Sequence, residues 1–516
     1  MSWSFGSLHF RDAALPFIRS AKSGMRAAMK KDYKVAKTPA EAVEQLEALY
    51  QTSVERLQTA LKTFLDGGPP PSEATRKSGA FVYPELRVTY EPDGPPPPIS
   101  RAFGKFTDTG LYASTITHPE LFADYLIEQL TLLADQYEIT IETGPSETEI
   151  PFSYVLDGAD DLDMDAASPA ELVRHFPYAD LSKVNDDLPN GLKVMQQAAV
   201  KPLSLFEAPR VDYSLQRLRH YTGTPYEDTQ QFILFTNYHR YVDAFTAWAI
   251  RQLKEDNHYE AFSAAGNVRV DADTPNAHAV VEGAPWRRFQ MPAYHLIAPG
   301  GRGITLVNIG VGPSNAKTIT DHLAVLRPQC WLMIGHCGGL RHSQRLGDYV
   351  LAHAYLRYDA VLDEDLPLEV PIPPIAEIQI ALEQGVASVS GDNREALKAR
   401  LRTGTVATYA DRNWELRYAA QARRINQSRA IAVDMESATI AANGLRLRVP
   451  YGTLLCVSDK PLHGELKLPG AANLFYQRSV SEHLAAGIET IEILKRDEGE
   501  ALHSRKLRSF DEPPFR

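Results

Sequence analysis

The chain has 516 residues, more than a single hydrophobic core usually holds, so two domains are expected. Hydrophobic residues make up 44% and charged residues 23% of the sequence, a balance that fits a globular protein and excludes a disordered or fibrous one. The formal net charge of -11 argues against a general nucleic-acid-binding protein, which would need a basic surface, but it allows a small cationic pocket.

The cysteines and the N-terminus indicate the compartment. Cys330, Cys337 and Cys456 lie in apolar segments without the paired spacing of a metal site, so we expect reduced thiols and no bound metal. The N-terminal stretch lacks the basic-then-apolar order of a signal peptide, and no run of about 18 apolar residues occurs. We therefore expect a cytoplasmic protein without membrane contacts.

The first 190 residues mix helices and strands. Residues 40–65 repeat apolar positions at helical spacing, between a capping box that starts at Thr38 and the Gly67-Gly68 pair that ends the helix. Further elements are predicted at residues 81–90 (strand), 118–137 (helix) and 138–144 (strand). No chemical motif stands out here, and we expect an N-terminal α+β domain over residues 1–200.

After a linking segment at residues 200–225, the sequence changes character. Short, almost continuously apolar strands alternate with helices, as in an α/β sheet that is covered on both faces. The predicted strands and their ends lie within residues 231–241, 304–312, 330–339, 348–356, 430–437 and 451–459. Ligands of such sheets bind beyond the carboxyl ends of the strands, and these strands end in clusters of Gly, Ser, Asp or Glu. We expect the chemistry at that edge of a second domain, residues 201–516.

Two glycine-rich turns follow predicted strands. Residues 308–314 read NIGVGPS and could bring backbone amides close to an anion, although a tight turn that needs glycine explains them equally well. Residues 334–340 read IGHCGGL and add the imidazole of His336, which could contact a ligand or serve as a structural hydrogen-bond donor.

Two other strand ends carry acids. Residues 433–437 place Asp434 and Glu436 after a buried strand, and residues 456–460 place Asp459 after another. Buried carboxylates need partners, so the first pair must lie at an exposed turn or meet a ligand. Helix capping would explain a single acid. Together, a carboxylate that accepts ribose hydroxyls and a second that protonates a leaving base form a minimal set for cleaving an N-glycosidic bond.

In this order, the GVGPS turn, the GHCGG turn, the MES strand end and the SD strand end resemble the nucleoside phosphorylase and nucleosidase superfamily over residues 225–495. The strings TNYHRYVDAF, ATYADRNWEL, AVDMESATIAANG and SDKPLHGELKLPG are similar to the AMP nucleosidase family in particular, whose members have an extra N-terminal domain. The resemblance implies a nucleoside phosphorylase-like mixed-sheet α/β fold for the second domain.

The resemblance also implies roles for individual residues. Met435 would lie against the sugar and Glu436 on its hydroxyls, so that a ligand supplies the missing partner of the glutamate. Ser458 would orient Asp459, and Asp459 would protonate the imidazole-ring nitrogen of adenine. Tyr409 would form a stacking wall for the base.

Departures from the phosphorylase pattern indicate the nucleophile. Phosphorylases hold their phosphate with a glycine-containing first loop, an arginine before the second turn and a serine inside it. Here the first loop, residues 235–240, reads FTNYHR, Met333 takes the arginine position and His336 the serine position. Of the phosphate ligands only Arg240 remains, so water is the expected attacker and hydrolysis is favoured over phosphorolysis.

The substrate's own 5′-phosphate then needs cations. An arginine fork suits phosphate geometry, and the superfamily presents an arginine to a neighbouring subunit before the GVGPS strand. Arg288 or Arg287 occupies that place, with Lys460 or Lys467 as alternatives. The competing interpretation is that both arginines are solvated surface residues.

These features favour an enzyme that hydrolyses AMP to adenine and D-ribose 5-phosphate. The alternatives are a phosphorylase or nucleosidase for unphosphorylated nucleosides and a non-catalytic nucleotide sensor. The extra domain and altered phosphate loop disfavour the former, and the retained acids Glu436 and Asp459 disfavour the latter. The resemblance further implies a homohexamer, activation by ATP with Mg, and inhibition by inorganic phosphate. No other cofactor, no nucleic acid and no membrane partner is expected.

Overall fold

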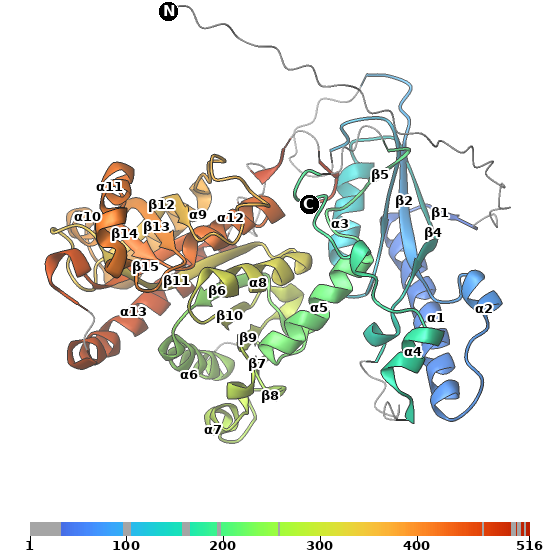
Figure 1. Ribbon diagram of the computed structural model, residues 1–516, viewed down its shortest axis with the longest axis horizontal. Helices are drawn as coiled ribbons and strands as arrows, with labels where there is room; N and C mark the ends of the chain where they lie inside the picture. The colour runs from blue at the N-terminus through green and yellow to red at the C-terminus, as the bar shows by residue number, and fades with distance from the viewer. Residues whose placement is uncertain are drawn as a thin grey trace, which may run out of the picture.

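The computed structural model describes residues 32–95, 105–156, 166–192, 198–255, 258–466, 469–496, 502, 507–509 and 512–516. Within these residues the chain forms two β-sheets, which lie at opposite ends of the molecule in Figure 1. We call the first sheet with its helices the N-terminal domain, and the second sheet with its helices the C-terminal domain. No helix in the described part of the chain is both long enough and apolar enough to cross a membrane.

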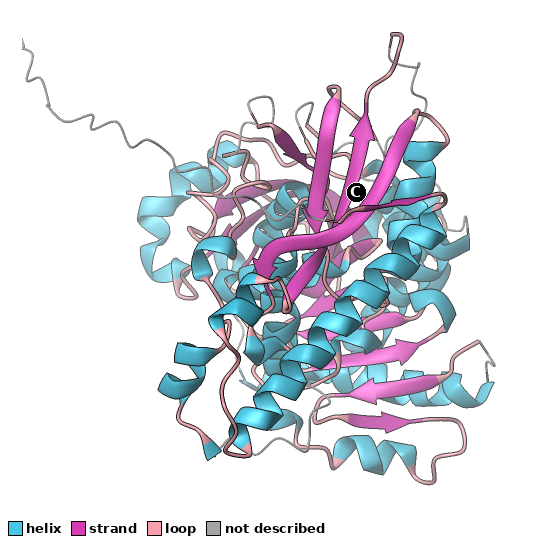
Figure 2. Cartoon of the chain, turned by 90° about the vertical axis from the view of Figure 1, so that its right-hand side faces the viewer, coloured by secondary structure: helices cyan, strands magenta, loops and turns pink. Residues whose placement is uncertain are grey.

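The N-terminal domain is built on a five-stranded sheet in the order β1-β4-β2-β3-β5, whose strands face the viewer in Figure 2. The strands are β1 (Lys34–Ala36), β2 (Val82–Tyr90), β3 (Gly110–Thr115), β4 (Ile139–Glu149) and β5 (Val200–Pro202). All pairings are antiparallel except β3 with β5. Since β5 crosses residue 200 and belongs to this sheet, it spans the predicted domain boundary, which stays a prediction.

Helix α1 (Pro39–Leu65) covers this sheet and packs against β2 and β4. Its buried residues recur at helical spacing, and Thr38 accepts a hydrogen bond from the Glu41 backbone, as the sequence predicts. The Glu41 carboxylate accepts instead from the Lys37 N–H at 2.8 Å, so the second bond of the predicted capping box is displaced by one residue. The other helices of this domain are α2 (Glu73–Lys77), α3 (Ala123–Ala134) and α4 (Pro169–His175).

The C-terminal domain contains a ten-stranded mixed sheet in the order β14-β13-β12-β15-β11-β6-β10-β9-β7-β8. An additional pairing of β14 with β11 closes five of these strands into a ring. The strands are β6 (Phe232–Thr236), β7 (Ala261–Ala264), β8 (Val268–Val270), β9 (Ala293–Ile297), β10 (Ile304–Asn308), β11 (Cys330–Gly339), β12 (Tyr349–Tyr358), β13 (Leu401–Tyr409), β14 (Ala432–Asp434) and β15 (Tyr451–Asp459). The mixed α/β fold is the predicted one.

Helices cover both faces of this sheet, which explains why its central strands are apolar on both sides. They are α6 (His239–Glu255), α7 (Ala277–Glu282), α8 (Pro313–Leu323), α9 (Ala376–Ser390), α10 (Arg394–Arg400), α11 (Tyr418–Ser428), α12 (Ser437–Leu447) and α13 (Pro469–Arg496). Strands β10, β6, β11 and β15 run parallel, so their carboxyl ends meet at one edge.

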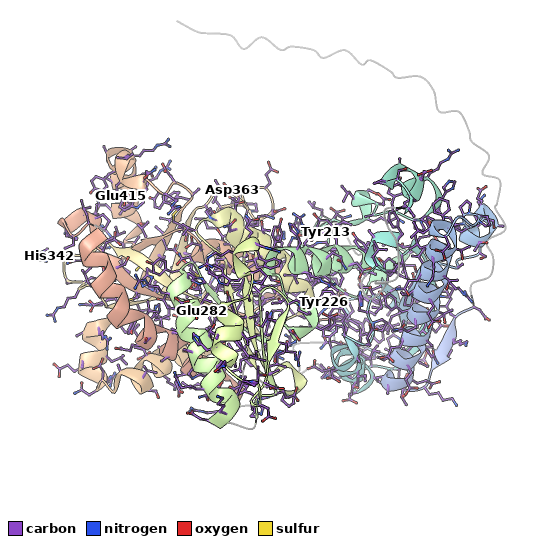
Figure 3. The ribbon with its side chains drawn as sticks, turned by 90° about the horizontal axis from the view of Figure 1, so that it is seen from below. Tyr213, Tyr226, Glu282, His342, Asp363 and Glu415 are labelled. Carbon is purple, nitrogen blue, oxygen red and sulfur yellow. The ribbon has the colours of Figure 1, made fainter. Side chains whose placement is uncertain are left out.

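The two domains meet along α5 (Ala208–Thr222), which packs against α8 of the C-terminal domain. Tyr213 of α5 and Tyr226, which follows it, lie at this junction in Figure 3. The end of the chain also returns to the N-terminal domain, where Phe515 is 1% exposed and its N–H donates to the Leu203 carbonyl at 3.0 Å. The linking segment of the sequence is thus largely a helix, which the sequence did not predict.

Candidate active site

The carboxyl ends of the parallel strands bring the predicted acidic tips together. Gly338, near the end of β11, pairs with Asp459 of β15 on one side and with Val433 of β14 on the other. Because Glu436 follows Val433 by three residues, both predicted catalytic carboxylates flank the end of the same strand. The geometry therefore places the two acids around one backbone segment.

Glu436 lies between β14 and α12 and is fully buried. Its Oε1 accepts a hydrogen bond from the Gly312 N–H at 2.6 Å, and its Oε2 accepts one from the Asn237 side-chain amide at 2.9 Å. The glutamate thus has protein partners for both oxygens, contrary to the expectation that a ligand alone supplies them. Gly312 has a φ of 118°, a conformation that favours glycine, and this turn aims its N–H at the carboxylate.

Asp434, the other acid of the pair, has a structural role. It accepts hydrogen bonds from the Ser437 N–H at 2.8 Å and from the Thr408 hydroxyl at 2.5 Å, and it is 4% exposed. These contacts cap the first turn of α12, which is the alternative given for a single acid at a strand end. The acidic pair therefore divides into a capping residue and a site residue.

Burial dominates the electrostatics of these acids. Loss of solvent and the neighbouring Asp434 carboxylate together raise the pKa of Glu436 to about 8, although the Gly312 and Asn237 hydrogen bonds oppose the shift. Burial also raises the pKa of Asp434. With this pKa, the charge of Glu436 changes near neutral pH. The charge matters because only an ionised carboxylate can accept hydrogen bonds from two hydroxyls without competition from its own proton.

Ser458 contacts Asp459 as the resemblance implies. The Ser458 hydroxyl donates to Asp459 Oδ1 at 2.7 Å and lies 3.4 Å from the Cys337 carbonyl oxygen. The pairing of β11 with β15 shifts register between Cys337 and Gly338, and Gly338 pairs with Asp459. A Cβ on Gly338 would lie 3.8 Å from Asp459 Oδ2, so the carboxyl group lies against the GHCGG backbone. These residues continue strand β11 to Gly339, so the turn predicted there was wrong.

His336 belongs to a chain of polar rings. The Tyr241 hydroxyl lies 3.3 Å from His336 Nε2 and 2.7 Å from His483 Nδ1, and His483 Nε2 lies 3.0 Å from the Leu454 carbonyl oxygen. Burial lowers the pKa of His483 to about 4, so this ring is neutral and donates from Nε2 to Leu454. Its Nδ1 must then accept from Tyr241, whose oxygen accepts from His336. The network fixes the orientation of His336, which fits the interpretation as a structural donor.

The remaining base-side prediction concerns Tyr409. Its ring is 4% exposed and packs in a small apolar cluster, with the Tyr358 ring centroid at 4.8 Å and that of Trp414 at 6.1 Å. Burial raises the pKa of Tyr409 to about 12. Packing accounts for the ring, whereas the Tyr409 hydroxyl is buried without a hydrogen-bond partner among the described residues. Its contact with a purine stays a prediction.

The predicted cations differ in their surroundings. Arg240 lies in the first turn of α6 and is half-buried. Arg287 and Arg288 are exposed in the turn Trp286–Arg288. That turn is fastened to α6, because the Trp286 ring stacks on His239 with centroids 4.0 Å apart. The fold therefore places both arginines beside the first turn of α6, which carries Arg240.

Lys460 forms an ion pair within the protein. Its ammonium group forms a 2.5 Å ion pair with Glu465, and the side chain is 8% exposed. The two residues also exchange backbone hydrogen bonds, so the pair closes the turn after β15. Lys460 therefore already has an acidic partner, and its contact with the 5′-phosphate stays a prediction. Lys467, the other suggested lysine, lies outside the described residues.

Sequence reasoning missed Asn237 and Gly312, the partners of Glu436. Both occur in segments that it singled out, the first loop and the GVGPS turn, but their separation from Glu436 by 199 and 124 residues hides the contacts. Met435 is half-buried next to the clamped glutamate. In the described part of the chain, no three His, Cys, Asp or Glu side chains are grouped in a way that could hold a metal ion.

Comparisons with known proteins agree with the two-domain arrangement. Residues 41–200 match the family described as bacterial AMP nucleoside phosphorylase N-terminus, and residues 270–490 match the phosphorylase superfamily. AMP nucleosidases of Escherichia coli strain K12 and of Escherichia coli O157:H7 are each 57% identical over 480 residues, 93% of this chain and 98% of the relative. A crystal structure of an AMP nucleosidase from Bacteroides thetaiotaomicron VPI-5482 is 28% identical and covers 56% of this chain and 98% of its own, with a TM-score of 0.41. The chain belongs to the AMP nucleosidase family.

Proposed function

We propose that the chain hydrolyses the N-glycosidic bond of AMP, giving adenine and D-ribose 5-phosphate. The observation that supports this most is the buried Glu436, clamped by Asn237 and Gly312, at the same strand end as the Ser458–Asp459 pair. This arrangement offers a hydrogen-bond acceptor for a sugar and a proton donor for a leaving base. Relatives at 57% identity bear the name AMP nucleosidase, which supports AMP as the substrate.

In the proposed mechanism, Glu436 accepts hydrogen bonds from the ribose hydroxyls while Met435 packs against the sugar. Ser458 donates to Oδ1 of Asp459, which favours the proton on Oδ2. Asp459 transfers that proton to the imidazole-ring nitrogen of adenine as the glycosidic bond breaks, so the base leaves neutral. Water then attacks the oxocarbenium-like carbon. The electron pair of the broken bond goes to adenine, and the attacking water loses a proton to solvent.

The residue types at positions 333 and 336 support water rather than phosphate as the nucleophile. Met333 is fully buried. By the family resemblance, its apolar side chain stands where phosphorylases present an arginine. His336 is engaged by Tyr241. The arginine and the serine that hold phosphate in phosphorylases are thus replaced by an apolar side chain and by a ring that contacts Tyr241.

Product analysis tests this function. Purified protein is incubated with AMP or adenosine, each with and without inorganic phosphate, and the products are separated by chromatography. Adenine and ribose 5-phosphate from AMP alone are expected. Phosphate-dependent cleavage of adenosine to ribose 1-phosphate would instead mean a phosphorylase, and release of no product from either compound would mean a nucleotide sensor.

We also propose the assembly and regulation that the family resemblance implies: a cytoplasmic homohexamer that ATP with Mg activates and inorganic phosphate inhibits. The match of residues 41–200 to a dedicated N-terminal family supports a separate regulatory domain. Light scattering coupled to gel filtration measures the assembly. Initial rates with AMP, at several concentrations of ATP or phosphate, measure the regulation, and rates that do not change would contradict it.

A further inference from the structure

Two helices of the C-terminal domain begin at the catalytic glutamate. Glu436 is the residue that precedes α12, and Gly312, whose N–H donates to Glu436, precedes α8. The two helices pack along one another. Their mutual position therefore sets the 2.6 Å hydrogen bond between Gly312 and Glu436.

The far ends of the same helices are cross-linked by polar side chains. The Asn443 amide of α12 donates to the Thr320 hydroxyl and to the Asp321 carboxylate of α8, both at 2.8 Å. Arg446 of α12 lies 3.6 Å from the same carboxylate. Lys317 of α8 forms an ion pair with Asp321 at 2.7 Å, which completes this end of the helix pair.

A residue of the N-terminal region, Asp186, joins this cross-link to α5. It accepts from the Arg446 guanidinium at 2.9 and 3.2 Å and from Arg210 Nε of α5 at 2.8 Å. Both arginines are at least nine-tenths buried. Burial opposes ionisation, yet Arg210 and Arg446 hold the pKa of Asp186 below its usual range, with Lys317 adding to the effect. Asp186 lies in a segment outside both sheets, and its charged side chain links α5 to the C-terminal end of α12.

The bridge borders a cavity of 340 Å³ between the two domains. Asn190, four residues after Asp186, donates to Asp365 at 2.8 Å across the same space. The segment therefore touches the C-terminal domain through specific polar contacts and not by close apolar packing. Such contacts fix direction and register, because each requires a particular atom position.

We propose that Asp186 is a positioning residue for the catalytic reaction: by holding the end of α12 against α5 and α8, it keeps Glu436 seated on the Gly312 amide. Helix α12 has 11 residues, so it transmits a displacement over about 16 Å. A shift of about 1 Å at a reacting group is enough to lower a rate about a hundredfold. The inference rests on the proposed role of Glu436 in binding the sugar.

The test is the Asp186→Asn variant of the full chain, compared with wild type for AMP cleavage across pH 5 to 10. We expect kcat/KM to fall about 10- to 100-fold. We also expect the rising limb of the pH profile to move to higher pH, because a weaker Gly312 hydrogen bond raises the pKa of Glu436 further. The groups that face Glu436 are otherwise unchanged, namely Asp434 and Asn237. The Asp186→Glu variant, which keeps the charge, should recover part of the loss.

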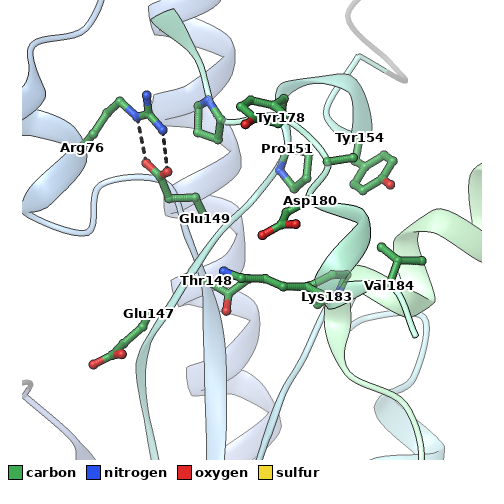
Figure 4. Close-up of a pocket in the computed structure, with 13 residues that line it drawn as sticks. Arg76, Glu147, Thr148, Glu149, Pro151, Tyr154, Tyr178, Asp180, Lys183 and Val184 are labelled. Atoms are coloured by element: carbon green, nitrogen blue, oxygen red, sulfur yellow. Dashed lines mark hydrogen bonds and ion pairs between the residues drawn. The ribbon is translucent and has the colours of Figure 1, made fainter. Parts of the chain in front are cut away.

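The matched control is Glu149→Gln. Glu149 forms a two-point ion pair with Arg76, at 3.0 and 2.6 Å, beside a different cavity of the N-terminal domain (Figure 4). Removing this pair also costs a carboxylate–arginine contact but leaves α8 and α12 untouched, so kcat/KM and the pH limb should stay at wild-type values. Equal effects of Glu149→Gln and Asp186→Asn would overturn the proposal, because both would then report general destabilisation.

A second variant covers the case in which Asp186→Asn does not fold. Asn443→Ala removes the link between α12 and α8 without leaving a buried charge unpaired, and it should move the pH limb in the same direction. A folded Asn443→Ala or Asp186→Asn protein with a wild-type limb and kcat/KM would refute the positioning role. Wild-type protein that fails to cleave AMP would refute the proposed function instead, so the two failures are distinguishable.

Discussion

At the scale of single residues, the site depends on how the fold treats three acids in the same neighbourhood. Asp434 accepts hydrogen bonds from Ser437 and Thr408 and caps a helix. Glu436 accepts hydrogen bonds from donors in distant segments, and Asp459 accepts one from the Ser458 hydroxyl. All three follow apolar strands in the sequence, so the differences arise from their partners alone. Substituting each acid therefore has a different expected outcome.

Replacing Asp459 with asparagine removes the proposed proton donor and keeps the shape of the side chain. General-acid transfer contributes about 100- to 10,000-fold, so kcat for AMP should fall by that range, while Ser458→Ala should cost less because it only orients the acid. Stopped assays of adenine release measure both variants. An Asp459→Asn enzyme with near wild-type kcat would contradict the mechanism.

Replacing Asn237 with leucine removes one of the donors that stabilise ionised Glu436. Because hydrogen bonds to the charged form lower the pKa, their loss raises the pKa of Glu436 above about 8. The protonated acid cannot accept from both hydroxyls, so kcat/KM at neutral pH should fall and its rising limb should move to higher pH. A pH series of initial rates at low AMP concentration measures this, with Asn237→Asp as a second variant. A limb that stays in place would mean that Asn237 does not act on Glu436.

Arg288→Ala tests the cation for the 5′-phosphate. The Michaelis constant for AMP should rise, whereas turnover of adenosine should change little, since adenosine has no phosphate. Arg287→Ala is measured in parallel because Arg287 shares the turn, and its guanidinium lies 4.4 Å from the Trp286 ring. Arg269→Ala, at an exposed arginine paired with Asp228, is the control. An unchanged constant for AMP in both test variants would exclude this turn as the phosphate site.

At the scale of elements, the residues that precede α8 and α12 form the proposed sugar-binding side of the site. The turn that precedes α8 needs glycine at position 312, since its φ of 118° lies where other residues are strained by about 1–3 kcal/mol. The same turn points the Gly312 N–H at Glu436. Strain in this turn should therefore change activity as well as stability.

Gly312→Ala should lower both the melting temperature and kcat/KM. Gly391→Ala offers a matched control, because Gly391 ends α9 with a φ of 66° and, like Gly312, has open space where a Cβ would lie. Alanine there should cost about 1–2 kcal/mol of stability with no loss of activity. Calorimetry and AMP kinetics on both variants separate the effects. Full activity in Gly312→Ala would show that the turn is not required to hold Glu436.

The sequence predicted those elements whose pattern is local. Helix α1, with its cap at Thr38, and strands β11 and β15 follow from apolar spacing and from glycine-rich or acidic ends. Helix α5 was missed because its buried face includes Arg210, Asp212 and Ser214, which break the apolar repeat. The same limit applies to the site: the strand ends could be found, but contacts made across more than a hundred residues could not.

At the scale of the whole molecule, the chain ties its two domains together at more than one place. Arg448 of the C-terminal domain is 3% exposed and donates to the Phe515 carbonyl at 2.7 Å, while Phe515 itself bonds to Leu203 beside the first sheet. Glu512 lies 2.6 Å from the same guanidinium. The last residues therefore neutralise a buried cation and cover the junction.

Removing residues 512–516 should leave Arg448 buried without its carboxylate partner. Loss of one partner of a buried ion pair costs about 3–5 kcal/mol, so a clear drop in melting temperature is expected. Differential scanning calorimetry measures it, and the additional Arg448→Met substitution should restore part of the loss by removing the unpaired charge. An unchanged melting temperature after truncation would mean that this segment does not stabilise the junction.

The three cysteines of the chain have a practical consequence for measuring distances between the two domains. All are buried and none forms a disulfide, and burial raises the pKa of the Cys330 and Cys456 thiols to about 12, so these two thiolates hardly form at neutral pH. Thiol-reactive maleimide or nitroxide reagents should therefore not react with the native protein. Single cysteines introduced on the surfaces of the two domains could then be labelled selectively. Interdomain distances could be measured by fluorescence or electron paramagnetic resonance without replacing the three buried native cysteines.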